Sequence, residues 1–426
     1  MKKKTTKLLL IVITIPLIGS VLLVLVSSLI FSPPYVFRTI VNGNSDVMDY
    51  KVFPERMIQK SSQPYNYKYN LDESLKAMSI DYMYRGKGKS KPLGLFLQET
   101  NTTSFIIVHD DEVVMEEYYN GYDKDMVNTS FSMAKSIDSL LIGMAIEDGY
   151  IKSVKQSIAD YISEFKGTNM ESITIEDLLM MRSNISYEEG KIWFSDDAKT
   201  YYMPDLRNLA LTHNNLTTKY QGKFHYNNYH PLLLGIILER STGKHVSEYF
   251  EEKLWNKIGA ENDASWSLDS KKTGFEKMES GINFKAIDFV KIGSMLLHSG
   301  TWNGQQILNE IWVKQSTLSD FPLNNDEYKG SFLENSNIGY KYMWYSTPNN
   351  NGSLDFFAMG KYGQYLYMSP ENNLVILRTG ISVGNVDSWT DVFKEVSLKL
   401  SPHLIKKGTI FSQNHTKNAH QSQDGR

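Results

Sequence analysis

The sequence lacks cysteine entirely, which excludes disulfide bonds, thiolate metal ligands and a cysteine nucleophile. It also lacks an excess of either charge, because 45 Lys and Arg residues face 48 Asp and Glu residues, for a net charge of −3. A balance of this kind does not favour a nucleic-acid-binding face. The chain does have 41% hydrophobic residues over 426 positions, which is enough for a sizeable core in one large domain or two smaller ones.

Three well-known site motifs are absent as well. The chain contains no Gly-x-Ser-x-Gly, the motif of the α/β-hydrolase nucleophile elbow, and no glycine-rich phosphate-binding loop. None of its nine histidines lies in His-Glu-x-x-His, and His225 and His230 lack the spacing of two ligands on one helix face, so we interpret both as structural. We therefore predict neither a metal ion nor an organic cofactor.

One long apolar run stands near the N-terminus. After four lysines among the first seven residues, Leu8–Phe31 carries no charge over 24 residues, which is enough for a helix across the roughly 30 Å hydrocarbon core. A cleaved signal peptide is the alternative, but its apolar stretch is usually about 7 to 15 residues long. We therefore predict a transmembrane anchor over 8–31, with residues 1–7 in the cytoplasm and the rest of the chain outside the cell.

Strand patterns occur near both ends of the remaining chain. A β-hairpin is predicted from Thr103 onward, in TSFIIVHDDEVVMEEYYNGY, and three more strand-like runs cover about 354–359, 364–369 and 374–379. More than 200 residues of mostly helical pattern lie between them. This order predicts an α+β fold, in which an antiparallel sheet built from distant segments is flanked by helices and carries an inserted helical subdomain.

The same patterns set the expected boundaries. Residues 32–70 are rich in Pro, Tyr and Asn and are predicted to form an extracellular spacer before a domain over 71–405. A helix is predicted within SITIEDLLMMRSNIS, with Asn184 as its left-handed stop, and a closing amphipathic helix is predicted over 386–404. The polar tail 406–426 is predicted to be disordered.

Ser-x-x-Lys occurs three times, at Ser132, Ser163 and Ser241. Ser163 lies in the polar segment YISEFKGTN, and Ser241 lies in RSTGKHV, where the glycine indicates a helix end. Only Ser132, in FSMAKSIDSLLIGMAIEDG, opens a long run with apolar positions at helical spacing. The N–H groups and dipole at a helix N-terminus favour developing negative charge, and Lys135 projects from the same face one turn later.

Two interpretations of this motif are open. If that face is buried, Lys135 loses hydration, which favours the neutral amine that can take the proton of Ser132 as it attacks a carbonyl. In the other interpretation Ser132 is an ordinary helix cap and Lys135 is a solvated surface lysine. Taken alone, the Ser-x-x-Lys motif favours the second interpretation.

Two further segments change that balance. Tyr226-x-Asn228 precedes a predicted helix, where a tyrosine beside a lysine can share its proton chemistry and Asn228 can orient the lysine and a substrate amide. Lys361-x-Gly363 ends one predicted strand and Gln364 opens the next, so glycine would let the backbone approach a ligand and lysine adds positive charge. Each segment also has an ordinary interpretation, as a capped helix with a packed tyrosine and as a tight turn.

In this order and at these separations, SMAK, YNN and KYG resemble the three motifs of the serine β-lactamase and penicillin-binding protein family. The closest resemblance is to the branch of class C β-lactamases, D,D-peptidases and related esterases and amidases. It covers roughly Thr103 to Gly380 and includes ITIEDLLMMRSNIS and YHPLLLGIILERSTG, which look like two helices of the family. One motif alone is common, whereas the ordered set is specific. The resemblance implies a β-lactamase/transpeptidase-like fold.

The resemblance also implies a role for each matching residue. Ser132 would form an acyl-enzyme, with Lys135 and Tyr226 acting together as general base. The backbone N–H groups of Ser132 and Gln364 would form an oxyanion hole. The implied substrate-binding residues are Asn228, Lys361, Gly363 and Gln364.

The function implied is that of a membrane-anchored, extracytoplasmic serine hydrolase of a bacterial cell envelope, acting on a small or cell-wall-derived ester or amide. Tyr362 stands where many relatives that bind β-lactams carry Thr or Ser to hold a substrate carboxylate. Its bulk disfavours β-lactamase and D-Ala-D-Ala carboxypeptidase activity and is compatible with an esterase or amidase. The alternatives are a penicillin-recognising sensor that acylates without efficient turnover or does not react at all, a β-lactamase or D,D-carboxypeptidase, and a purely structural extracellular domain.

Overall fold

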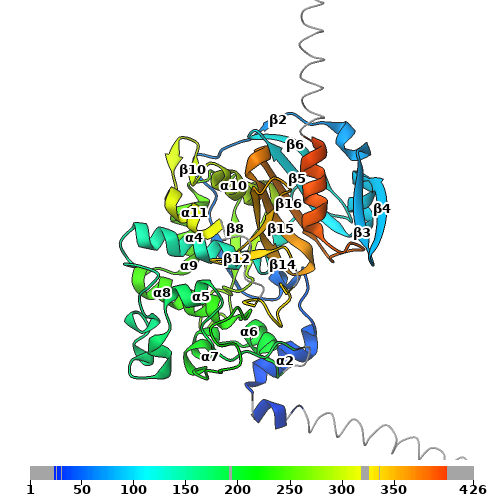
Figure 1. Cartoon of the computed structure of the whole chain (residues 1–426). Helices are drawn as coiled ribbons and strands as arrows, with labels where there is room; N and C mark the ends of the chain where they lie inside the picture. The colour runs from blue at the N-terminus through cyan, green and yellow to red at the C-terminus, as the bar shows by residue number, and fades with distance from the viewer. Residues whose placement is uncertain are drawn as a thin grey trace, which may run out of the picture.

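A large sheet forms the centre of the molecule (Figure 1). The computed structural model describes residues 24, 26–29, 31–190, 194–317, 326–334 and 336–400. Neighbouring strands of the sheet run antiparallel, except that β2 runs parallel to β6. Its eight strands, in spatial order, are β12 (Gly339–Lys341), β13 (Trp344–Pro348), β14 (Leu354–Gly360), β15 (Gln364–Ser369), β16 (Leu374–Gly380), β5 (Thr102–His109), β6 (Glu112–Tyr118) and β2 (Lys68–Tyr69).

Segments from distant parts of the chain close the sheet, as the sequence predicted. β16 pairs with β5 along its whole length, which joins the two strand-rich regions. The β5–β6 hairpin turns at Asp110 and Asp111, whose φ values of 49° and 60° are those of two-residue turns that match the twist of paired strands. The three strands predicted over 354–359, 364–369 and 374–379 are confirmed as β14, β15 and β16, each within one residue of its predicted ends.

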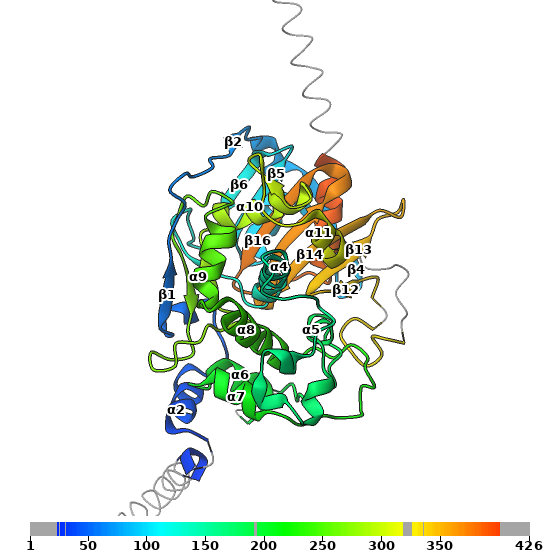
Figure 2. The same ribbon diagram turned by 90° about the vertical axis from the view of Figure 1, so that its left-hand side faces the viewer.

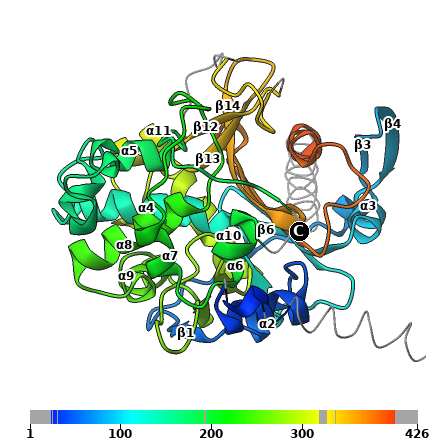
Figure 3. The ribbon, with the colours of Figure 1, turned by 90° about the horizontal axis from the view of Figure 1, so that it is seen from below.

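Helices cover both faces of the sheet (Figure 2). On one face α10 (Ala286–Leu297) packs against β5, β15 and β16. On the other face the helix over 389–400 places the ring of Phe393 5.1 Å from that of Tyr367 and 6.5 Å from that of Phe105. Figure 3 shows this helix on the opposite side of the sheet from α10 and α4. It confirms the predicted closing helix, whose last predicted residues lie outside the described part.

The segment between the two strand regions is mostly helical, as predicted. Residues Met133 to Ala145 of α4 (Met133–Glu147) are all buried, because the helix runs between the sheet, at β14 and β15, and α8. The helix predicted to stop at Asn184 is shorter, since α5 begins after a capping box made by Thr174 and ends at Leu179. The remaining helices are α3 (Leu93–Glu99), α5 (Ile175–Leu179), α6 (Asp196–Tyr202), α7 (Leu206–Thr212), α8 (Tyr229–Thr242), α9 (Val246–Phe250) and α11 (Glu310–Thr317).

The predicted spacer over 32–70 is instead part of the domain. α2 (Pro33–Asn42) buries Tyr35 and Val36, while β1 pairs with β8 and β2 pairs with β6. These three elements span only ten, four and two residues, which is too short for a clear periodic pattern. The smaller β elements are a sheet of β1 (Glu55–Ile58), β8 (Ala264–Ser267), β9 (Ile282–Phe284) and β7 (Asn128–Thr129), and the pairs β3 (Ser79–Tyr84) with β4 (Lys87–Pro92) and β10 (Thr301–Trp302) with β11 (Gln305–Gln306).

Three sequence predictions concern the chain ends. Most of the transmembrane anchor predicted over 8–31 lies outside the described residues, and the cytoplasmic end 1–7 and the tail 406–426 lie wholly outside them. Within the described part, no helix combines the length and the apolar character that crossing a bilayer requires.

Candidate active site

Ser132 lies at the N-terminal end of α4 and contacts Lys135. Lys135 Nζ donates a hydrogen bond of 3.0 Å to Ser132 Oγ, whereas the Ser132 hydroxyl makes no capping bond to the helix backbone. Lys135 is buried, with 2% of its surface exposed. The interpretation of this motif as a helix cap with a solvated lysine is therefore wrong.

The other two copies of Ser-x-x-Lys have different surroundings. Ser163 Oγ donates a hydrogen bond to the side chain of the next residue, Glu164. Ser241 Oγ donates to the carbonyl of Leu238, and Lys244 forms an ion pair with Glu252, just beyond the end of α9. Within the described structure, only Ser132 has its hydroxyl bonded to the lysine of its own motif.

Lys135 has two more neighbours. Its Nζ donates a 2.9 Å hydrogen bond to the carbonyl of Glu279 and lies 5.0 Å from the centre of the Tyr226 ring. A neutral amine would keep one N–H on the Glu279 carbonyl and turn its lone pair toward the Ser132 hydroxyl. The arrangement therefore suits proton transfer from Ser132 to Lys135.

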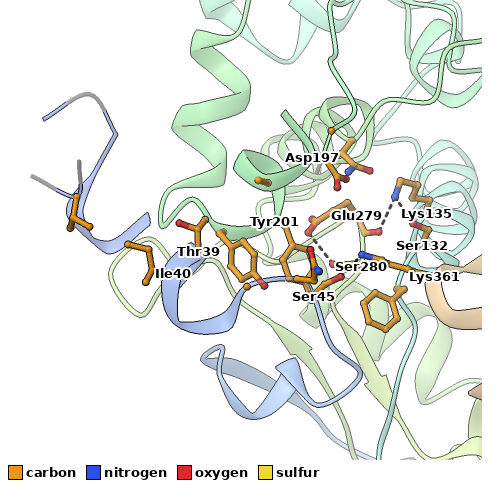
Figure 4. A pocket seen from close by; sticks show the side chains of 18 residues that line it. Thr39, Ile40, Ser45, Ser132, Lys135, Asp197, Tyr201, Glu279, Ser280 and Lys361 are labelled. Carbon is orange, nitrogen blue, oxygen red and sulfur yellow. Dashed lines mark hydrogen bonds between the residues drawn. The ribbon is translucent and has the colours of Figure 1, made fainter. Parts of the chain in front are cut away.

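A cavity of about 500 Å³ opens beside these groups (Figure 4), a volume within the usual range of small-molecule sites. Part of its wall comes from residues 39–45, from α6, and from Glu279 with Ser280. The cavity thus brings the N-terminal segment together with the nucleophile motif. Of the predicted site residues, Ser132, Lys135, Asn228 and Lys361 line the cavity, and Tyr226, Gly363 and Gln364 are not part of its described lining.

Asn228 brings a hydrogen-bond acceptor to the cavity wall. Its Nδ2 donates to the Tyr187 hydroxyl at 2.8 Å and to Thr200 Oγ1 at 3.3 Å, while its Oδ1 is buried without a hydrogen-bond partner among the described residues. Tyr187 and Thr200 therefore orient the amide, and among the described residues no hydrogen bond joins it to Lys135, which the sequence predicted Asn228 to orient. The side chain that caps the start of α8 belongs to Asn227.

The turn between β14 and β15 contacts the N-terminal segment. Lys361 Nζ donates a 2.6 Å hydrogen bond to Ser45 Oγ, and the Tyr362 hydroxyl donates to the carbonyl of Ser45. Tyr362 has a φ of 65°, and its ring packs edge-to-face on Phe131, with ring centres 5.2 Å apart. Tyr362 thus contacts Ser45 and Phe131 and is not part of the described cavity lining.

Internal packing explains the glycine of this turn. Gly363 has a φ of 79°, and a Cβ there would collide with the guanidinium of Arg378. Arg378 is buried, donates a hydrogen bond to the Gly363 carbonyl and lies 3.9 Å from the centre of the Trp389 ring. Burial lowers the pKa of Arg378 to about 9. The sequence predicted that glycine admits a ligand here, whereas the structure shows that it admits Arg378.

Gln364 holds the same turn through its side chain. Its Nε2 donates hydrogen bonds to the carbonyls of Lys361, at 3.0 Å, and Gly380, at 2.7 Å. Its Oε1 accepts a hydrogen bond from the N–H of Gly380. The side chain is therefore occupied within the protein, and the contact of the Gln364 backbone N–H with substrate stays a prediction.

Several charged groups at and behind the cavity wall were not predicted from the sequence. Lys277 and Glu279 form a buried ion pair at 3.0 Å, and burial lowers the pKa of Lys277 although the Glu279 charge opposes this. Asp138 follows Lys135 by one turn of α4, and neither of its carboxylate oxygens has a hydrogen-bond partner among the described residues. Burial raises the pKa of Asp138 well above its usual range. The i, i+3 spacing from Lys135 was a signal for Asp138, but nothing local in the sequence indicated Glu279.

One cluster of potential metal-ligating side chains occurs within the described residues. It consists of Glu239, His245 and Glu276. Arg207 binds both carboxylate oxygens of Glu239, and Arg56 forms an ion pair with Glu276. Two guanidinium groups thus compensate the two carboxylates, so we interpret the cluster as an ion-pair network that joins separate elements.

The sequence model of the Beta-lactamase family matches residues 97–379, which is more than half of the chain and includes all three motifs. The chain belongs to the Beta-lactamase family. One relative of this Beta-lactamase family member is the 6-aminohexanoate-dimer hydrolase of Paenarthrobacter ureafaciens, which is 27% identical over 316 residues, or 69% of this chain and 74% of the relative.

Solved structures share the fold of this Beta-lactamase family member. A Bacillus anthracis structure assigned as a 6-aminohexanoate-dimer hydrolase has a TM-score of 0.70 at 22% identity, covering 85% of this chain and 94% of that one. A family VIII carboxylesterase has a TM-score of 0.53 at 14% identity, covering 70% and 92%. The α+β fold of the serine β-lactamases and penicillin-binding proteins is thereby confirmed. The chain is a hydrolase of the serine β-lactamase fold.

Proposed function

We propose that the chain hydrolyses an ester or amide through an acyl-enzyme formed on Ser132. The observation that carries this proposal is the 3.0 Å contact between Lys135 Nζ and Ser132 Oγ at the wall of the cavity. In the acylation step, Ser132 Oγ bonds to the substrate carbonyl carbon while its proton passes to Lys135 Nζ. The bond to the leaving group then breaks, and the leaving alcohol or amine takes up that proton.

Water completes the reaction by hydrolysing the acyl-enzyme. Lys135 and Tyr226, whose ring lies beside the amine, share the proton transfers in this proposal. The backbone N–H groups of Ser132 and Gln364 stabilise the oxyanion, a type of contact that contributes about 10² to 10³ in rate per donor. Lys361 contributes positive charge at the cavity wall.

We infer that the substrate class is a small linear amide or ester. The relative that matches over most of its length is named for the hydrolysis of the 6-aminohexanoate dimer, in which an amide joins two linear units. The unpartnered Asn228 Oδ1 supports an amide, because it can accept the N–H of the bond to be cleaved. The Tyr362 hydroxyl donates its hydrogen bond to the Ser45 carbonyl. Tyr362 therefore does not offer the small hydroxyl with which Thr or Ser would hold a β-lactam carboxylate.

We further propose that an N-terminal anchor holds this hydrolase on the outer side of a bacterial cell membrane. The support is the uncharged run of 24 residues that follows four lysines. Fractionation of cells that produce the full chain, followed by protease treatment of intact cells, tests the location. Recovery in the soluble cytoplasmic fraction would contradict it.

The hydrolase proposal is tested by comparing the full-length protein with Ser132→Ala. The substrates are a chromogenic short-chain ester and the 6-aminohexanoate dimer, and a fluorescent penicillin serves as an acylating probe. Turnover that disappears in Ser132→Ala, but not in the control Ser163→Ala, supports the hydrolase. Stoichiometric labelling by the penicillin without any turnover supports the alternative, a sensor that acylates once. Turnover that survives in Ser132→Ala would contradict both.

A further inference from the structure

The segment over residues 43–49, which we call the N-terminal strap, passes along the edge of the cavity (Figure 4). Gly43, Asn44 and Ser45 line the cavity, together with two residues at the end of α2. The strap lies outside residues 97–379, which the family sequence model matches. One wall of the candidate active site therefore comes from a part of the chain that carries none of the three motifs.

Hydrogen bonds at both ends hold the strap in place. At one end Ser45 accepts hydrogen bonds from Lys361 Nζ, at 2.6 Å, and from the Tyr362 hydroxyl. At the other end the buried carboxylate of Asp49 accepts a 2.8 Å hydrogen bond from the Tyr201 hydroxyl. The strap is thus attached to the turn after β14 and to α6, which both contribute to the cavity wall.

Tyr362 is held in a backbone conformation that bulky residues rarely adopt. Its φ of 65° lies in the left-handed region, where a large non-glycine residue persists only if its surroundings over-determine it. The surroundings here are the ring of Phe131, which it meets edge-to-face, and the carbonyl of Ser45. Its side chain therefore connects the strap to the turn that precedes Ser132.

We propose that the N-terminal strap is the specificity-determining wall of this hydrolase, and that Ser45 and Tyr362 set how wide a substrate the site accepts. The inference rests on the proposed function, because it assumes that the cavity binds the substrate of Ser132. In this proposal a substrate that is wide next to its carbonyl meets the strap, and its binding breaks the hydrogen bonds of the strap to Lys361 and Tyr362. A linear substrate leaves those bonds in place, so the intact strap selects for linear substrates.

The first test uses the full-length protein and two esters with the same leaving group, p-nitrophenyl butyrate and p-nitrophenyl cyclohexanecarboxylate. The wild type is expected to prefer the linear butyrate, measured as kcat/KM. Tyr362→Phe removes the bond to the Ser45 carbonyl and is expected to reduce this preference about tenfold, chiefly through KM for the wide ester. The matched control is Tyr342→Phe, which removes the 2.8 Å hydrogen bond from Tyr342 to Glu176 and should keep the wild-type preference. A preference within twofold of the wild type in Tyr362→Phe overturns the proposal.

The second test uses the absence of native cysteine. Ser45→Cys introduces a single thiol at the cavity wall, which methanethiosulfonates of increasing size modify, with complete labelling checked by mass spectrometry. We expect the largest reagent to lower kcat/KM for the butyrate ester at least about tenfold, because the added group occupies the cavity. Ser163→Cys, at an exposed position outside the cavity lining, is the control and should lose no activity. Full activity of completely labelled Ser45→Cys overturns the proposal.

The two proposals fail in different ways. Turnover that survives in Ser132→Ala contradicts the serine mechanism, whatever the strap variants do. Turnover that depends on Ser132 but keeps its ester preference in Tyr362→Phe contradicts the strap alone. If Tyr362→Phe does not fold, as a thermal unfolding scan would show, the labelled Ser45→Cys protein decides the question.

Discussion

The rings of Phe131 and Tyr362 meet edge-to-face, with centres 5.2 Å apart and planes at 70°, and both residues have positive φ, at 44° and 65°. Left-handed backbone costs a bulky residue on the order of 1–3 kcal/mol, so two such residues in contact indicate strong packing around them. One immediately precedes Ser132, and the other immediately follows Lys361. Their contact holds the nucleophile and the third motif on the same side of the cavity.

Replacement of Lys135 by arginine tests its part in proton transfer. Lys135→Arg keeps a long side chain with N–H donors but cannot supply a neutral base, because a guanidinium does not lose its proton in proteins. We expect kcat for a chromogenic ester to fall by about 10² to 10⁴. Lys314→Arg, on the exposed side of α11, is the matched control and should keep its rate. A Lys135→Arg protein with more than a tenth of the wild-type kcat would show that another group is the base.

Asn228→Ala is expected to weaken amide hydrolysis more than ester hydrolysis. The Asn228 Oδ1 is an unpartnered acceptor at the cavity wall, and only the amide has an N–H to offer it. The loss of one such contact corresponds to about 0.5–1.5 kcal/mol, or about 2- to 12-fold in kcat/KM. Steady-state kinetics on an amide and an ester with the same acyl group measure the difference. Equal losses for the two substrates would contradict this role.

A pair of glycine variants separates backbone strain from packing. Gly363 and Gly352 both have positive φ, 79° and 86°, but a Cβ at Gly352 meets nothing within 4 Å, whereas one at Gly363 meets Arg378. Gly352→Ala is expected to lower the free energy of unfolding by about 1–2 kcal/mol. Gly363→Ala should lose about 1–3 kcal/mol more, because Arg378 must move. Urea unfolding measures both, and equal losses would show that Arg378 yields without cost.

Because His230 is buried, we expect the protein to lose stability in mild acid. It is buried, its Nε2 contacts Ser183 Oγ at 2.6 Å, and burial lowers its pKa to about 3. Its unfolded pKa is about 6.5, so below that pH the unfolded chain binds a proton that the folded chain refuses. Stability is therefore lost as the pH falls from about 6.5 toward 3, by about 2 kcal/mol at pH 5. His230→Leu should remove this part of the difference in unfolding free energy between pH 7 and pH 5, and an unchanged difference would contradict the prediction.

For the buried Asp138 we expect the opposite dependence of stability on pH. Burial raises the pKa of Asp138 well above its usual range, the Glu279 charge adds to this and the Lys135 charge opposes it. In the window between the unfolded and the folded pKa the unfolded chain has lost a proton that the folded chain keeps, so stability falls as the pH rises. Asp138→Asn should therefore stabilise the protein, and the gain should increase with pH through that window. Asp125→Asn is the control, because Lys285 lowers the pKa of Asp125. Removal of the Asp125 carboxylate should therefore not stabilise the protein. Chemical unfolding at several pH values measures both.

The locally patterned parts of the fold could be predicted from the sequence. Strands β14, β15 and β16 and the long helix α4 each repeat their apolar positions over several residues, and that signal does not depend on the rest of the chain. The elements of segment 32–70 were not predicted, because they are too short to repeat an apolar pattern. They form by contact with partners far along the chain. The end of α5 at Leu179 was not predicted either, because a helix of five residues is also too short to show a repeated pattern.

The candidate site shows the same division. By itself the sequence determined the fold class, the three motifs and the choice of Ser132 over Ser163 and Ser241, since order, spacing and helical pattern are properties of the chain. Only the tertiary structure decided that Lys135 is buried against the Glu279 carbonyl, that Gly363 makes room for Arg378, and that the N-terminal strap forms a cavity wall. Each of these depends on contacts between residues that are distant in sequence, and such contacts arise only when the core packs.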